Sequence, residues 1–205
     1  MRKEIEDRIR EVYPTGDIDE RNEDALYGED YLEKFRSVVR EAIKDTGLRG
    51  EFLVFWDSEA GFKITITEYP HPAPSQWLFG MKNENKLAWI HENGRPFPVM
   101  WLKVSRVFPA YELYYNLWKP RGDTGYLDTE YTKSPVSDMW AVFHERLHQG
   151  MEGAGIVIIP QDEGRELVEF VTEDVYEVED CNDLPEDAPP RKVIQNVYSC
   201  LFPIT

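Results

Sequence analysis

The feature that most constrains the fold is an aromatic stretch, FPVMWLKVSRVFPAYELYYNLW, which runs from Phe97 to Trp118. The Phe108-Pro109 step divides it into two predicted strands, because proline cannot donate a hydrogen bond inside a sheet. In the first strand both faces carry apolar side chains: Val99 and Trp101 on one face, and Met100, Leu102 and Val104 on the other. A strand of this kind lies centrally in a sheet that is covered on both sides. We therefore expect a covered sheet to be built around this segment.

Alternation of apolar and polar residues predicts the other strands. The segments EFLVFWD (51–57) and GFKITITEY (61–69) flank the turn sequence SEAG, so they predict an antiparallel pair. Shorter strands are expected at 86–91, at 155–160 and, as an edge strand, at 193–202.

Apolar residues at helical spacing predict helices at 2–13, 31–45 and 137–149. The segment 161–171 fits a helix or a hairpin, of which the helix is favoured. The expected fold class is α+β. A mainly antiparallel sheet of five to seven strands carries two N-terminal helices and one central helix packed on it. We expect a single α+β domain that spans residues 1–205, since no linker is long enough to divide the chain.

Composition restricts the classes of partner. The chain has 39 acidic and 23 basic residues and a formal net charge of -16, which repels phosphate groups, so neither nucleic acid nor an anionic membrane is an expected partner. No apolar run approaches 18 residues, and the first residues, MRKEIEDRIREVYP, lack the apolar core of a signal peptide. We therefore expect a cytoplasmic protein. Cys181 and Cys200 form no C-x-x-C pair and are expected to be reduced, with a disulfide between them as the alternative.

One segment carries a recognisable chemical pattern. His144-Glu145-Arg146-Leu147-His148 has the form H-E-x-x-H and resembles the zincin metallopeptidases over these five residues. The resemblance implies that His144 and His148 bind zinc and that Glu145 is the general base. It also implies a third ligand, for which Glu166 is the candidate, with Glu163 and Glu169 as alternatives.

The same helix can be explained without a metal. Its apolar residues form a continuous arc, and the two histidines lie just beyond the edge of this arc. These residues are Met139, Trp140, Val142, Phe143 and Leu147. Arg146, between the histidines, is a fixed positive charge that would need a partner near a metal ion. On this interpretation His144 and His148 are boundary residues of an amphipathic helix.

The favoured function is therefore a non-catalytic interaction module that binds a basic protein and needs no cofactor. Two acidic segments, 17–30 and 173–187, would attract such a partner electrostatically. In broad character the chain is similar to the immunity proteins that bacteria make against nuclease-type toxins, a likeness of class that rests on no motif. A zinc-dependent hydrolase is the alternative. A small-molecule-binding domain with an aromatic cavity between sheet and helix is a third hypothesis.

Overall fold

The computed structural model describes residues 1–53, 61–68, 83–122, 124–175 and 191–202. Its elements, in chain order, are α1 (Lys3–Val12), η1 (Glu23–Ala25), α2 (Glu29–Ile43), β1 (Arg49–Leu53), β2 (Gly61–Thr67), α4 (Asn83–Asn93), β3 (Phe97–Ser105), β4 (Ala110–Pro120), β5 (Leu127–Thr132), α5 (Asp138–Gly153), β6 (Val157–Ile158), α6 (Gln161–Gly164), β7 (Leu167–Val175), β8 (Arg191–Asn196) and α7 (Val197–Leu201).

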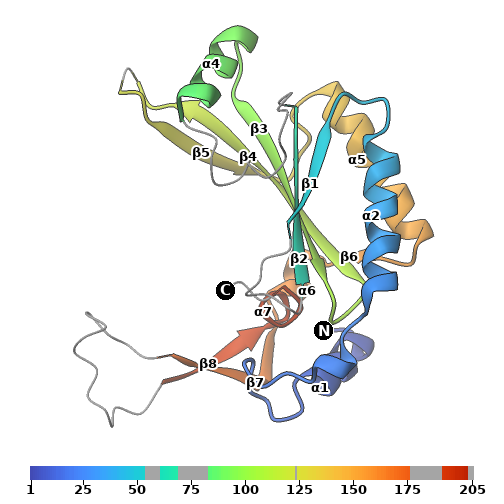
Figure 1. Cartoon of the computed structure of the whole chain (residues 1–205). Helices are drawn as coiled ribbons and strands as arrows, with labels where there is room; N and C mark the ends of the chain where they lie inside the picture. Colours follow the sequence, from blue (N-terminus) through green and yellow to red (C-terminus); the bar gives the residue numbers. More distant parts are fainter. Residues whose placement is uncertain (54–60, 69–82, 123, 176–190, 203–205) are drawn as a thin grey trace.

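A six-stranded sheet forms the main layer (Figure 1). Five strands follow one another in the order β1-β2-β3-β4-β5 and pair antiparallel, while the short β6 adds to β4 in parallel. The predicted α+β class with a mainly antiparallel sheet is confirmed. The predicted pair at 51–57 and 61–69 corresponds to β1 and β2, and the turn expected between them lies outside the described residues.

The division at Phe108-Pro109 is also confirmed, since β3 ends at Ser105 and β4 begins at Ala110. Apolar residues at alternate positions of the central strands enter one core, in which Ile64 pairs with Leu102 and Ile66 with Met100. Because side chains in a strand alternate between faces, this register turns one apolar row toward the helices. The sheet is therefore fixed by its buried face.

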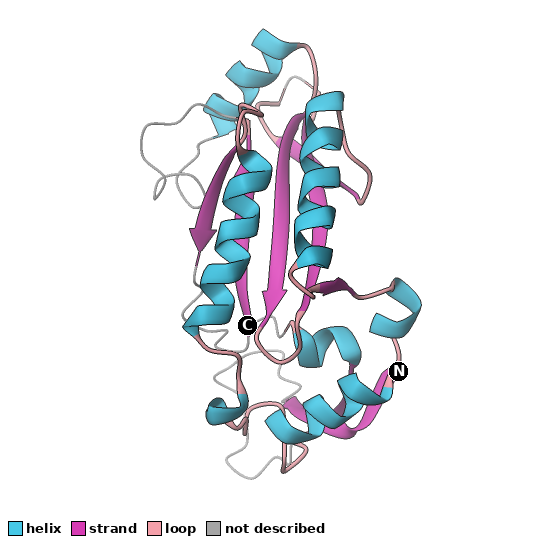
Figure 2. Cartoon of the chain, turned by 90° about the vertical axis from the view of Figure 1, so that its right-hand side faces the viewer, coloured by secondary structure: helices cyan, strands magenta, loops and turns pink. Residues whose placement is uncertain are grey.

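Two long helices, α2 and α5, lie side by side across that face (Figure 2). Their apolar stripes join the same core, with Phe35 and Val39 from α2 and Phe143 and Leu147 from α5 fully buried. The helices approach closely at Gly150, where a Cβ atom would meet Val38 Cγ1 at 2.6 Å. Glycine at this position lets the two backbones approach.

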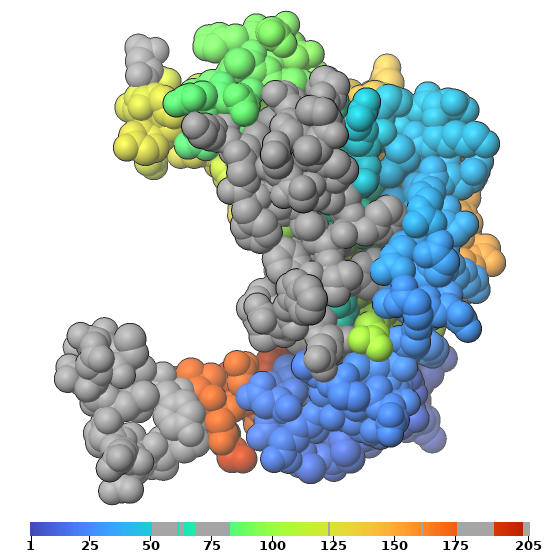
Figure 3. Space-filling model, viewed as in Figure 1, coloured from blue at the N-terminus to red at the C-terminus, as the bar shows by residue number. Residues whose placement is uncertain are grey.

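The two ends of the chain meet in a second buried cluster, to which Val107, Ala110 and Ile159 also contribute. Helix α1 buries Ile5 and Ile9 among residues from β7 and α7, so the N-terminal helix packs on C-terminal elements. The two-stranded β7–β8 sheet lies below the main sheet, and the molecule bends around the side away from α2 (Figure 1). The space-filling view shows a hollow on that side, between the part formed by α4 and β5 and the part formed by β7 (Figure 3).

The strand predicted at 86–91 is wrong, because these residues belong to helix α4. Trp89 and Ile90 are buried while Lys86 and Leu87 are half-buried, a spacing of three to four residues that suits a helix. Lys86 Nζ lies 3.8 Å from the centre of the Trp118 ring, so a cation–π contact helps to hold α4 on the sheet. The six residues at 86–91 were too few to distinguish the helical spacing of apolar residues from the alternation of a strand.

The helix predicted at 161–171 is wrong for most of its length. Only Gln161–Gly164 is helical, and β7 begins at Leu167. Val168 and Val171 are both fully buried, a spacing of three residues that resembles a helical face. A register shift between Val168 and Thr172 produces this spacing within a strand, since a β-bulge changes which residues face the core.

The strand predicted at 193–202 is correct only in its first part. Strand β8 ends at Asn196, whose side chain accepts a hydrogen bond from Ser199 N at 2.9 Å and so caps helix α7. Helix α5 also differs from expectation, since it continues past the predicted end at Gln149 to Gly153.

Candidate functional site

Helix α5 places the H-E-x-x-H residues over strand β4. Its buried stripe consists of Trp140, Phe143, Leu147 and Met151, at steps of three and four residues. Val142, which we expected in this stripe, is 45% exposed, since it lies on the outer side of the helix. The predicted place of the histidines at the edge of the stripe is confirmed, because both are half-buried.

The two histidines meet each other and two tyrosines of β4. His144 Nε2 and His148 Nε2 are 2.6 Å apart, as expected for residues four apart on one helical face. Tyr115 Oη lies 3.0 Å from His144 Nδ1, and Tyr111 Oη contacts His148 Nδ1. The four side chains therefore form one continuous chain of polar contacts, Tyr111–His148–His144–Tyr115.

This environment keeps both imidazoles neutral at pH 7. Burial, and secondly the nearby His148, lowers the pKa of His144 to about 4, and burial also lowers the pKa of His148. Burial raises the pKa of Tyr111 and of Tyr115, so both phenols keep their protons. Each hydroxyl can either donate to a neutral Nδ1 or accept from an Nδ1–H.

The other residues of the zincin pattern have partners of their own. Glu145 is exposed and accepts a hydrogen bond from Gln149 Nε2 at 3.3 Å. Arg146 donates to the backbone oxygen of Lys44 on the neighbouring helix at 2.8 Å. The charge of Arg146 is therefore engaged at α2.

The candidates for a third ligand lie with the N-terminus. Glu166 pairs with the amino group of Met1, and Glu163 accepts from the backbone nitrogen of Arg2 at 2.9 Å. Glu169 is exposed on β7. Among the described residues, no group of three or more histidine, cysteine, aspartate or glutamate side chains could hold a metal ion.

The structure brings two acidic segments together at the second cluster. Ile18 N donates to Thr172 O at 3.0 Å and Thr172 N donates to Gly16 O at 2.7 Å, so the loop after α1 runs along β7. Gly16 has φ +81°, and a Cβ atom there would meet Phe170 O at 2.4 Å. Only glycine allows this close contact between backbones.

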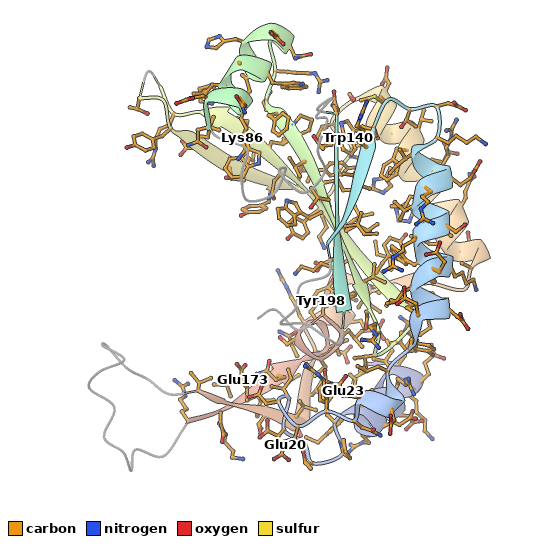
Figure 4. All side chains as sticks on the ribbon, viewed as in Figure 1. Glu20, Glu23, Lys86, Trp140, Glu173 and Tyr198 are labelled. Atoms are coloured by element: carbon orange, nitrogen blue, oxygen red, sulfur yellow. The ribbon has the colours of Figure 1, made fainter. Side chains whose placement is uncertain are left out.

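We call the resulting surface the acidic rim. It consists of Asp17, Asp19, Glu20, Glu23, Asp24, Glu173 and Asp174. Glu20, Glu23 and Glu173 are seen together on the lower part of the molecule (Figure 4). Of the predicted segment 173–187, only Glu173–Val175 belongs to the described part of the chain.

Most carboxylates of the acidic rim lack a basic partner. Arg21 Nε lies 2.6 Å from Glu23 Oε1, and Lys192 Nζ lies 3.8 Å from Asp174 Oδ1. In the part of the chain that the structure describes, the other five rim carboxylates form no ion pair. The rim therefore carries an excess of negative charge that these two basic residues only partly compensate.

A cavity of about 220 Å³ opens beside the acidic rim. Asp19, Glu112 and Glu173 supply carboxylates to its wall, while Tyr198 and Phe202 supply aromatic surface. Cations also line the cavity: Lys103, with its Nζ 3.9 Å from Glu112 Oε2, and Arg21, which pairs with Glu23. The space is large enough for one long side chain rather than a cofactor.

Sequence reasoning had no signal for the tyrosine partners of the histidines or for the contact between Gly16 and Thr172, because each joins residues far apart in the chain. In the described ranges, no helix has the length and apolar character needed to cross a membrane. Comparisons with protein-family models, with curated proteins and with solved structures found no match to this chain.

Proposed function

We propose that this protein is a non-catalytic interaction module whose acidic rim binds a basic protein. The observation that carries the proposal is the backbone contact between Ile18 and Thr172, which joins two acidic segments that are distant in the sequence. Either segment alone would be an ordinary solvated loop. Together they form one predominantly negative surface next to a cavity, with Arg21 and Lys192 as basic residues paired to it.

The cavity suggests how a partner is held. Asp19, Glu112 and Glu173 line the cavity together with Tyr198. A lysine or arginine side chain matches this lining, because its stem can pack on the ring while its charged end meets carboxylates. The partner is thus defined by chemistry, as a protein with clustered lysine and arginine. In this respect the module is similar in character to an immunity protein.

Measured energies of exposed ion pairs indicate how much the rim carboxylates should contribute to binding affinity. Each pair at a surface contributes about 0.2–1 kcal/mol, so three carboxylates contribute about 1.5 kcal/mol, or roughly a tenfold change in affinity. Such charges act mainly on the association rate, and salt screens them over about 10 Å at 0.1 M. We therefore expect binding that weakens steeply with ionic strength.

The experiment uses a fluorescent arginine- and lysine-rich peptide as the probe. Its anisotropy is measured with the full chain from 20 to 300 mM salt, together with a triple variant, Asp19→Asn, Glu20→Gln and Glu173→Gln. We expect roughly tenfold weaker binding and a smaller salt dependence for the variant. The matched control removes three exposed carboxylates of α2, at Glu29, Glu33 and Glu41, and so has the same net charge.

The control decides between a local surface and the overall charge. Equal weakening in both variants, or no binding by the unmodified chain at 20 mM salt, would refute the proposal. For a natural partner recovered at low salt, carbodiimide coupling of carboxylates to amines locates the contact. The proposal requires crosslinks to the acidic rim and not to α2.

A further inference from the structure

The contact between His144 and His148 poses a question about what lies between their Nε2 atoms. At 2.6 Å, the two nitrogens are too close for two lone pairs or for two N–H groups to face each other. One proton between them satisfies the pair, with one imidazole donating and the other accepting. A cation that accepts both lone pairs also satisfies it, after a small separation of the two nitrogens.

The tyrosines make the second arrangement accessible. When Tyr111 and Tyr115 accept from the Nδ1–H groups, both Nε2 atoms carry lone pairs and face the same point. Metal-binding histidines are commonly held in this way, with the far ring nitrogen donating to an oxygen that fixes the tautomer and the ring orientation. The change from the proton-sharing form moves protons within the chain of four groups and leaves the number on the imidazoles unchanged.

We propose that His144 Nε2 and His148 Nε2 together bind one divalent transition-metal ion of the kind that prefers imidazole, such as Zn²⁺, Ni²⁺ or Cu²⁺, with water completing the coordination. This site is separate from the acidic rim and does not depend on the proposed function. It also differs from a zincin centre, since it includes neither Glu145 nor Glu166.

The geometry needs only a small adjustment. Two nitrogens bound to one tetrahedral ion at about 2.0–2.1 Å are about 3.3 Å apart, so the Nε2 atoms must separate by about 0.7 Å. Both histidines are half-buried at the edge of the helix, so neither is enclosed in the core. Arg146, the nearest positive charge in the sequence, donates to the carbonyl of Lys44 at the end of α2.

Two protein ligands predict a modest affinity and a clear order of ions. Structural zinc sites use four protein ligands, so this site has half of them, and a dissociation constant on the order of micromolar is expected. Affinity should follow the general order for nitrogen ligands, with Cu²⁺ bound more tightly than Ni²⁺, while Mg²⁺ and Ca²⁺, which prefer oxygen, do not bind.

The test is calorimetric titration of the full, untagged chain with Ni²⁺ at pH 7.5, after treatment with a chelator and its removal. We expect one ion per chain, and at least tenfold weaker binding in His144→Gln and in His148→Gln. Tyr111→Phe and Tyr115→Phe should weaken binding by about 10–100-fold, the usual effect of losing an outer partner of a ligand. His91→Gln is the matched control, because His91 is exposed on α4, and it should bind Ni²⁺ like the unmodified chain.

A second measurement covers the case in which a variant does not fold. In the unmodified chain, paramagnetic Ni²⁺ should broaden the imidazole ¹⁵N resonances of His144 and His148 before any others. Absence of binding at 1 mM Ni²⁺ would overturn the proposal. So would equal binding by folded His144→Gln, or broadening centred on carboxylates of the acidic rim.

Discussion

The close approach of α2 and α5 at Gly150 makes a quantitative prediction. In Gly150→Ala, the new Cβ atom would meet Val38 Cγ1 at 2.6 Å, so the helices must shift or the valine must move. Alanine gains about 1 kcal/mol over glycine inside a helix. Overpacking of a fitted contact costs about 1–3 kcal/mol. We expect Gly150→Ala to lower the free energy of unfolding by about 1 kcal/mol.

A second substitution, Val38→Ala, completes a double-mutant cycle and relieves the contact. Val38 is half-buried, so Val38→Ala loses about 0.8 kcal/mol of burial and regains about 0.5 kcal/mol of helix propensity. In the double variant the alanine at position 150 fits, and the chain should be about 0.7 kcal/mol more stable than the unmodified protein. The implied coupling between the two positions is about 2 kcal/mol, within the range for residues in contact.

Urea unfolding followed by tryptophan fluorescence measures each free energy, with unchanged m-values as the condition for comparison. Gly153→Ala is the control within the same helix, because a Cβ atom there meets nothing within 4 Å. It should be neutral or slightly stabilising. A stabilising Gly150→Ala, or a coupling near zero, would show that the helices do not pack as described.

Three further predictions concern single groups. The pKa of His144 is lowered to about 4 from 6.5 by folding, so the unfolded chain takes up a proton at this imidazole at a higher pH than the folded chain does. The free energy of unfolding should therefore fall as the pH drops from 6.5 toward 4. The fall should be smaller in His144→Gln, with chelator present in both measurements. Glu68→Ala should cost about 2 kcal/mol in urea unfolding, because the Trp140 Nε1–H that donates to Glu68 at 2.6 Å loses its acceptor, whereas Glu68→Gln should cost less. Cys200 is fully buried, and burial raises its thiol pKa to about 12. In Cys181→Ser, where Cys200 is the remaining cysteine, a thiol reagent should therefore label the chain only after urea unfolding. Rapid labelling of the native chain would contradict this burial.

Periodicity predicted those parts of the fold in which long segments are buried on one side. The break at Phe108-Pro109 and the pairing of β1 with β2 followed from local patterns, because each depends on neighbouring residues. The same reasoning failed at α4 and β7. Helix α4 offered too few apolar positions, and in β7 a bulge placed Val168 and Val171 on one face at a helical spacing.

The candidate sites divide in the same way. The meeting of His144 with His148 follows from their spacing on a helix. Their hydrogen-bond partners, Tyr115 and Tyr111, lie 29 and 37 residues away, and only the packing of α5 on β4 brings them together. The acidic rim depends on a contact between Gly16 and Thr172 that no local pattern could signal.

The pairing of the two chain ends determines the order in which a growing polypeptide acquires its properties. The main sheet and its two covering helices come mostly from one continuous stretch, so a nascent chain can assemble them before β7 and α7 are made. Helix α1 precedes the main sheet in the chain, yet Ile5 and Ile9 must wait for residues of β7 and α7 to bury them. Until then the helix presents an uncovered apolar face, which is the kind of surface that chaperones bind. The acidic rim does not exist on the nascent chain until Thr172 has emerged, because its two segments meet only through the backbone contacts of Gly16 and Ile18 with Thr172.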